Sequence, residues 1–138
     1  MAKGRHSPSV HRIPLLVLLF LGGCAAPRGP GTPPAYVLSR LYFGQSSQQG
    51  PVDARDFDAF LDTCVTRRFP QGLTRYAADG QWQGRDGLTL KEKTVVVEIV
   101  RPGDSAGAGK IKDIIRLYKL RFSQESVLLV EENPSVEF

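Results

Sequence analysis

The residues of this chain that could take part in chemistry are few, and their positions narrow what the chain can do. Its two histidines, His6 and His11, precede a short apolar run near the N-terminus. Once such a leader is removed, the remaining chain has no imidazole for Ser-His-Asp or Cys-His catalysis or for holding a metal ion. We therefore predict no metal site, no cofactor and no catalytic residue of these classes.

The stretch GDSAGAGK, residues 103–110, has the glycines and the lysine of a phosphate-binding loop but not their spacing. Asp104 stands where that motif has its first glycine, and Ile111 replaces the hydroxyl residue that would bind Mg²⁺. We predict no nucleotide site here, and we interpret the glycines as a flexible loop leading into a frayed helix start.

One predicted helix carries the second cysteine of the chain and a group of carboxylates. Cys64 falls on the apolar face of this helix, so we expect a buried and inert thiol; a reactive thiol or an intermolecular disulfide is the alternative. The carboxylates occupy the front of the helix, where they cap it and oppose the positive end of its dipole. They are Asp53, Asp56, Asp58 and Asp62.

Arg40, Tyr42, Glu98 and Trp82 are the candidate binding residues. Arg40 and Tyr42 alternate with apolar residues in one predicted strand, and Glu98 does so in another, so they should project together from an open sheet face. Trp82 belongs to a hairpin that could lie close by. Tyr, Trp and Arg are enriched at binding hot spots, which favours a ligand or partner surface. The simpler alternative is an Arg40–Glu98 cross-strand pair with no further role.

Two helices are expected to position these residues. The first should be capped by Asp53 and stopped by Pro70, and its apolar residues recur at helical spacing. The second should be capped by Asp104 or Ser105 and carries another apolar stripe.

Strands are predicted around these helices. The segments LTRYA and GQWQ flank a turn expected at Asp79-Gly80, and a second turn is expected at Arg85-Asp86-Gly87. Other strands are expected at 36–44, 88–100 and 125–132. Four strands can cover both helices only if the helices lie together on one sheet face. The order therefore predicts an α+β, ferredoxin-like β-α-β-β-α-β sandwich with a four-stranded antiparallel sheet.

The first 23 residues have the pattern of an export signal. Lys3, Arg5 and Arg12 form a positive region before the apolar core Ile13–Leu21. This core is too short to cross a bilayer as a helix, which needs about 20 residues.

The apolar core ends in Leu21-Gly22-Gly23-Cys24, which resembles the lipobox of bacterial lipoproteins. The resemblance implies a diacylglyceryl group on Cys24, cleavage just before it and acylation of the new N-terminus. Ala25 then implies sorting to the periplasmic face of the outer membrane, because it is not the Asp that retains lipoproteins at the inner membrane. The alternatives are an ordinary signal peptide cut near Ala26 and an uncleaved anchor.

Removal of the leader changes the charge of the chain. Without Lys3, Arg5 and Arg12 the 18 basic residues fall to 15 against 14 acidic ones, and the net charge falls from +4 to +1. We therefore expect no nucleic-acid partner. The predicted organisation is a signal peptide at 1–23, a lipidated cysteine and Pro/Gly-rich linker at 24–35, one α+β domain at 36–132 and a tail at 133–138.

Four motifs, in their order and spacing, resemble the bacterial family catalogued as domain of unknown function 3574. This resemblance implies the limits of the domain and brings no activity and no catalytic residues. The motifs are RLYFG (Arg40–Gly44), RFPQGLT (Arg68–Thr74), GQW (Gly80–Trp82) and YKLRFSQESVLLV (Tyr118–Val130).

These observations predict a non-catalytic, lipid-tethered protein of the cell envelope. We expect it to contact the membrane through Cys24 and to bind an envelope protein, or a second copy of itself, through the open sheet face. The alternative is a small cofactor-independent enzyme, as in ferredoxin-like dimers of αβ-barrel type, that uses Tyr42, Glu98 or a lysine for acid–base work. A purely structural spacer is a third possibility.

Overall fold

The computed structural model describes residues 35–47, 49–83 and 87–138. The predicted signal peptide, Cys24 and the linker as far as Pro34 lie outside the described residues. Within the described ranges, no helix is both long and apolar enough to cross a membrane.

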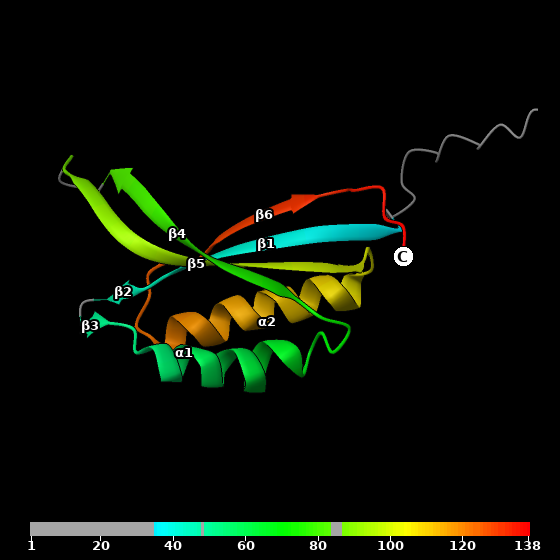
Figure 1. Ribbon diagram of the computed structural model, residues 1–138, viewed down its shortest axis with the longest axis horizontal. Helices are drawn as coiled ribbons and strands as arrows, with labels where there is room; N and C mark the ends of the chain where they lie inside the picture. The colour runs from blue at the N-terminus through cyan, green and yellow to red at the C-terminus, as the bar shows by residue number, and fades with distance from the viewer. Residues whose placement is uncertain (1–34, 48, 84–86) are drawn as a thin grey trace, which may run out of the picture. The chain divides into compact units, whose positions relative to one another are not determined.

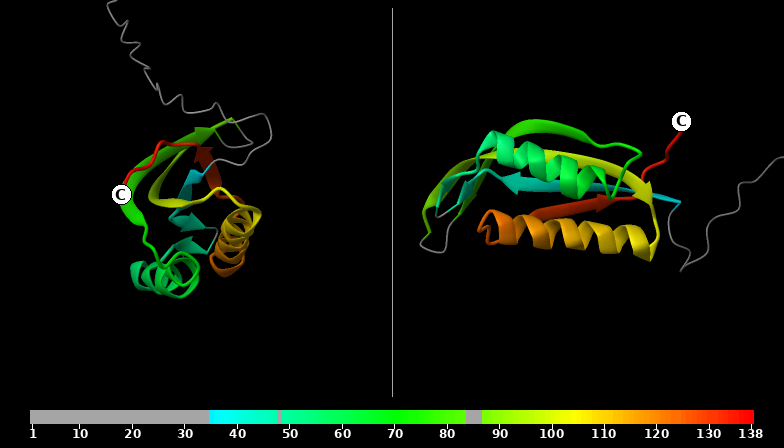
Figure 2. Two further views of the ribbon diagram at one scale, coloured as in Figure 1. Left: turned by 90° about the vertical axis from the view of Figure 1, so that its right-hand side faces the viewer. Right: turned by 90° about the horizontal axis from the view of Figure 1, so that it is seen from below.

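The domain is a four-stranded antiparallel sheet with both long helices on one of its faces (Figures 1 and 2). The strand order β4-β5-β1-β6 and the chain order give the predicted ferredoxin-like topology. The sheet strands are β1 (Tyr36–Gly44), β4 (Thr74–Gln83), β5 (Thr89–Pro102) and β6 (Leu128–Glu132). The other elements are a small hairpin of β2 (Ser46–Ser47) and β3 (Gly50–Pro51), and the helices α1 (Ala54–Phe60), η1 (Leu61–Thr66) and α2 (Ser105–Arg121).

Period-2 alternation divides each central strand between two environments. Leu41 and Phe43 of β1 are fully buried beneath the helices, and so are Val97 and Ile99 of β5. Burial of such a side chain stabilises the fold by roughly 1.5–3 kcal/mol. Cys64 packs half-buried against this core.

An aromatic cluster joins the two helices to the sheet. The ring of Tyr118 on α2 lies 4.5 Å from that of Phe43 and 5.3 Å from that of Phe60. The Tyr118 hydroxyl is buried, and it donates to the carbonyl oxygen of Gly44 at 2.8 Å. The end of β1 is therefore tied directly to α2.

The first helix begins as predicted and then widens. Asp53 caps α1, because its side chain accepts hydrogen bonds from the amides of Arg55 and Asp56. The next six residues form the π-helix η1, which the apolar spacing did not predict. Within it, the Thr63 hydroxyl donates to the Ala59 carbonyl, a side-chain bond that competes with regular helical bonding.

The turn predicted at Asp79-Gly80 is wrong, because both residues lie inside β4, opposite Lys93 and Glu92. A Cβ at Gly80 would lie 2.8 Å from Oγ1 of Thr94, so this glycine permits close packing across the strands. The chain instead reverses between Gln83 and Thr89. Of the second predicted turn, Arg85 and Asp86 lie outside the described residues.

The cap predicted at Asp104 is confirmed, whereas the loop and frayed helix start predicted from the glycines of residues 103–110 are wrong from Ser105 onward, where the chain is helical. Asp104 caps α2 by accepting from the Gly107 amide at 2.7 Å, and the helix begins at Ser105. Gly107 lies in the first turn, where a Cβ would be 3.0 Å from Nη1 of Arg101. The glycine therefore allows the helix to pack against this arginine.

Candidate functional site

Among the described residues, no helix or strand lies over the sheet face opposite α1, η1 and α2, which we call the open face (Figure 2). Strand alternation and register place the even-numbered residues of all four strands on this open face. Several large apolar or aromatic side chains there are exposed to solvent. They are Tyr76, Trp82, Leu90, Val100 and Leu128.

A hydrogen-bonded charge cluster occupies the middle of the open face. Nε of Arg40 donates to Oε1 of Glu98 at 2.6 Å, and Nη1 of Arg40 donates to Oε1 of Glu132 at 3.1 Å. The hydroxyl of Tyr76 donates to the same Glu98 oxygen at 3.2 Å. One carboxylate oxygen thus receives two donors from the two neighbouring strands.

The pKa is raised for two members of the cluster, Arg40 and Tyr76. The hydrogen bond to Glu98 raises the pKa of Arg40 above its already high ordinary value. Desolvation raises the pKa of Tyr76, and its hydrogen bond to Glu98 acts in the same direction. At neutral pH, Tyr76 is therefore a neutral hydrogen-bond donor and Arg40 a permanent cation.

A hollow of about 330 Å³ adjoins this cluster. Its volume is in the range of sites that hold small ligands, and its walls combine apolar side chains with the Glu98 carboxylate. The lining residues are Leu38, Gln71, Gly72, Leu73, Thr74, Glu98 and Val100.

The structure brings together three of the four predicted binding residues. Arg40 pairs directly with Glu98, as expected from the strands, and Tyr42 lies two residues further along β1. Trp82 is separated from them: it pairs with Leu90 and lies six residues beyond Tyr76, about 20 Å of strand. The role of these residues as a binding surface stays a prediction.

Two residues of the cluster were missed by the sequence reasoning. Tyr76 was hidden by the turn wrongly placed at Asp79-Gly80, since only an unbroken β4 puts it beside Glu98. Glu132 reaches Arg40 because β6 pairs with β1 at the sheet edge. The alternation of apolar and polar residues in these strands could have placed both residues on the open face.

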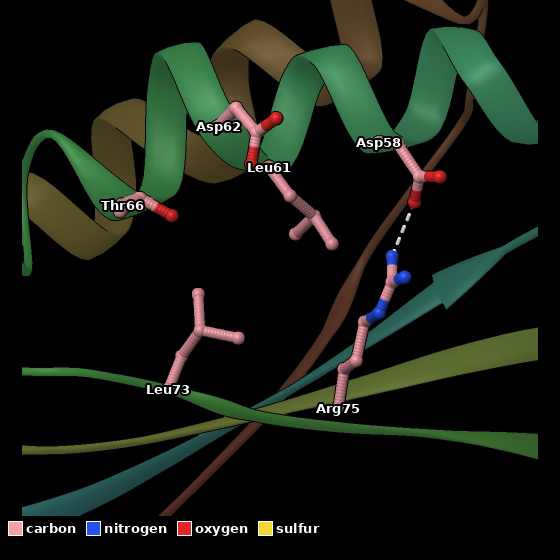
Figure 3. Close-up of a pocket in the computed structure, with 6 residues that line it drawn as sticks. All are labelled: Asp58, Leu61, Asp62, Thr66, Leu73 and Arg75. Carbon is pink, nitrogen blue, oxygen red and sulfur yellow. Dashed lines mark hydrogen bonds and ion pairs between the residues drawn. The ribbon is translucent and has the colours of Figure 1, made fainter.

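A second hollow, of about 410 Å³, lies between the first helix and β4 (Figure 3). Arg75 on β4 forms an ion pair with Asp58 on α1, and Leu61 and Leu73 approach from opposite walls. Asp58 thus links the helix to an edge strand in addition to facing solvent. Asp62 and Thr66 complete the lining.

The fold is similar to that of a phage SAM lyase. The structure of that lyase in complex with S-methyl-5′-thioadenosine matches with a TM-score of 0.57 and 21% sequence identity, over 72% of this chain and 82% of the lyase chain. The apo structure matches with a TM-score of 0.55 and 18% identity, over 78% and 86% of the two chains. At these identities the likeness is one of fold.

Among curated proteins, none matches this chain. A family model does match, over most of the folded part, as the four sequence motifs predicted. The model of the family described as protein of unknown function (DUF3574) covers residues 38–138, and the chain therefore belongs to that family.

Proposed function

We propose that the folded domain is a binding module that captures an envelope protein through its open sheet face. One observation carries the proposal: the exposed side chains of Val100 and Leu128 share a sheet face with the Arg40–Glu98–Tyr76 cluster, and Trp82 and Leu90 lie farther along the same face. Exposed apolar side chains beside tyrosine and arginine favour an interaction site, because tyrosine and arginine are common among binding hot spots.

A photo-crosslinking residue in the full-length chain tests this surface in cells. It is placed at Leu128 on the open face and, as a matched control, at Leu120, an exposed leucine of α2. We expect a discrete adduct from position 128 alone, and its loss when Arg40→Ala is added. Equal adducts from both positions, or none from 128, contradict the proposal. An adduct of twice the chain mass identifies a second copy as the partner.

We further propose that the domain is tethered to the periplasmic face of the outer membrane by acyl chains on Cys24. The support is the sequence Leu21-Gly22-Gly23-Cys24 together with the positive and apolar segments before it. Mass spectrometry of membrane fractions tests the tether. We expect a triacylated peptide beginning at Cys24 in the wild type and none from Cys24→Ala; an unacylated peptide retaining Gly23 contradicts it.

A second candidate function is a small cofactor-independent enzyme. The observations that favour it are the fold likeness to a SAM lyase and the hollow lined by Glu98, a carboxylate that could accept a proton and that also accepts a hydrogen bond from Tyr76. The test is incubation of the full chain with S-adenosylmethionine and chromatography for S-methyl-5′-thioadenosine. Release abolished by Glu98→Gln supports this function. Equal rates of S-methyl-5′-thioadenosine release by the wild type and Glu98→Gln contradict this function.

A further inference from the structure

The two-stranded arm of β4 and β5 extends beyond the end of β1 (Figure 1). The last residue of β1, Gly44, pairs with Thr94, while β4 and β5 stay paired from Asp79 and Lys93 to the end of β4. Glu92 lies at the base of this arm, directly opposite Gly80.

Two glycines make room for the side chain of Glu92. A Cβ on Gly44 would lie 2.7 and 2.8 Å from the two carboxylate oxygens of Glu92. A Cβ on Gly80 would lie 3.6 Å from Cγ of Glu92 and closer still to Thr94. Neither glycine has a positive φ angle, so its backbone conformation does not require glycine. At both positions the absence of a side chain is what matters. The carboxylate therefore packs against the backbone of Gly44, where a Cβ would displace it.

Glu92 has no cationic partner within the described residues, whereas other carboxylates of the sheet do. Glu98, Glu131 and Asp79 each lie within 4 Å of an arginine or lysine nitrogen. Burial raises the pKa of Glu92, and a hydrogen bond from Trp82 acts against this rise. Glu92 is therefore a half-buried carboxylate with no positive partner among the described residues, and a bound cation would supply one.

Trp82 lies diagonally across the strand pair from Glu92, two residues beyond Gly80. About half of Trp82 is exposed to solvent, so its ring is accessible beside Glu92. An aromatic ring attracts a cation placed over its face, and a carboxylate attracts the same cation by its opposite charge.

We propose that Glu92 and Trp82 form a binding site for a small organic cation, such as a quaternary ammonium or a sulfonium. The positive centre pairs with Glu92, and an apolar substituent packs on the ring of Trp82. A metal ion fits less well, because Glu92 supplies one carboxylate and the described part of the chain has no cluster of three potential ligands. The site is separate from the Arg40–Glu98 cluster and does not depend on the function proposed for it.

The chain contains a single tryptophan, so its intrinsic fluorescence reports on this site directly. The full-length protein in detergent is titrated with two pairs of probes that differ in charge. Choline is compared with its neutral carbon analogue 3,3-dimethylbutan-1-ol, and S-adenosylmethionine with S-adenosylhomocysteine. We expect a saturable change in Trp82 fluorescence with at least one cation, and at least tenfold weaker binding of its neutral counterpart. No saturable change with either cation, or equal binding of cation and neutral analogue, overturns the proposal.

Two variants assign the effect to the carboxylate. Glu92→Gln keeps the size of the side chain and removes its charge, so cation affinity should fall at least tenfold. Asp79→Asn, which removes a carboxylate from the opposite face of the same arm, should leave the affinity unchanged. Unchanged affinity in Glu92→Gln also overturns the proposal. The comparison of each cation with its neutral analogue uses the wild-type protein, so it tests the proposal even if a variant does not fold.

Discussion

Arg101 and Glu131 form an ion pair from β5 to the edge strand β6, with Nη2 of Arg101 2.7 Å from Oε1 of Glu131. Ser39 on the intervening strand β1 accepts from Nε of Arg101 and donates to the same Glu131 oxygen, both at 2.9 Å. Arg101 is 3% exposed. Three strands are therefore joined by one hydrogen-bonded network on the helix side of the sheet, in which Arg101 and Ser39 are buried and Glu131 is partly exposed.

Arg101→Ala should destabilise the domain strongly. It leaves the buried Ser39 hydroxyl without its donor and removes the hydrogen bond to the partly exposed Glu131, and loss of such hydrogen bonds costs about 1–3 kcal/mol. The matched control is Arg116→Ala, because Arg116 is mostly exposed and pairs with Asp113 on the same helix. That substitution should change the free energy of unfolding by less than about 0.5 kcal/mol. Urea denaturation followed by circular dichroism measures both values, and equal effects would contradict the buried network.

Glu131 should contribute stability that is lost in acid. The hydrogen bond from Arg101, followed by that from Ser39, lowers the pKa of Glu131 despite its partial desolvation. A carboxylate with a lowered folded-state pKa stabilises the fold above its ordinary pKa, and this contribution disappears as pH falls through the lowered value. Glu131→Gln should therefore narrow the difference in unfolding free energy between pH 7 and pH 3. An identical pH dependence in variant and wild type would contradict this expectation.

Glu92 should change the pH dependence of stability in the opposite direction to Glu131. Burial raises its pKa, so its contribution is favourable below the ordinary pKa of a glutamate and is lost as pH rises through the raised value. We expect Glu92→Gln to be more stable than the wild type at pH 7, and this advantage to shrink at pH 4. Denaturation of both proteins at the two pH values measures the change. An advantage that grows in acid would contradict the raised pKa.

The sequence predicted the parts of the site that depend on local alternation. The placement of Arg40 beside Glu98 follows from two strands whose apolar residues lie on one face, and it is present in the structure. Trp82 was grouped with them because Asp79-Gly80 has the composition of a turn. In the structure Gly80 lies inside β4 and packs against Thr94 of β5. Because β4 continues past Gly80, Trp82 lies away from the cluster.

The niche of Glu92 could not be predicted in the same way. It requires Gly44 from β1 and Gly80 from β4 to flank one residue of β5, and no pattern within a single strand records that meeting. The π-helix was also missed, because Leu61 and Val65 stay buried whether the turn is regular or widened. Contacts between distant segments, and not local propensity, determine these features.

Gly107 and Gly109 provide a matched pair within the first two turns of α2. Both interrupt a helix, where replacement of glycine by alanine ordinarily stabilises by about 1 kcal/mol. A Cβ at Gly109 meets nothing within 4 Å, so Gly109→Ala should stabilise by about this amount. A Cβ at Gly107 would lie 3.0 Å from Nη1 of Arg101 and 3.1 Å from the carbonyl oxygen of Pro102.

The Arg101 side chain and the Pro102 carbonyl, which a Cβ at Gly107 would approach, are both held in place. Nη1 of Arg101 donates to the Pro102 carbonyl at 2.9 Å, and Arg101 also donates to Ser39 and Glu131. Gly107→Ala should therefore lower the free energy of unfolding despite its better helix propensity. Thermal denaturation of the two variants gives the comparison, with Tm rising for Gly109→Ala and falling for Gly107→Ala. A rise of equal size in both would show that α2 can shift away from Arg101, and that the close contact does not constrain the start of the helix.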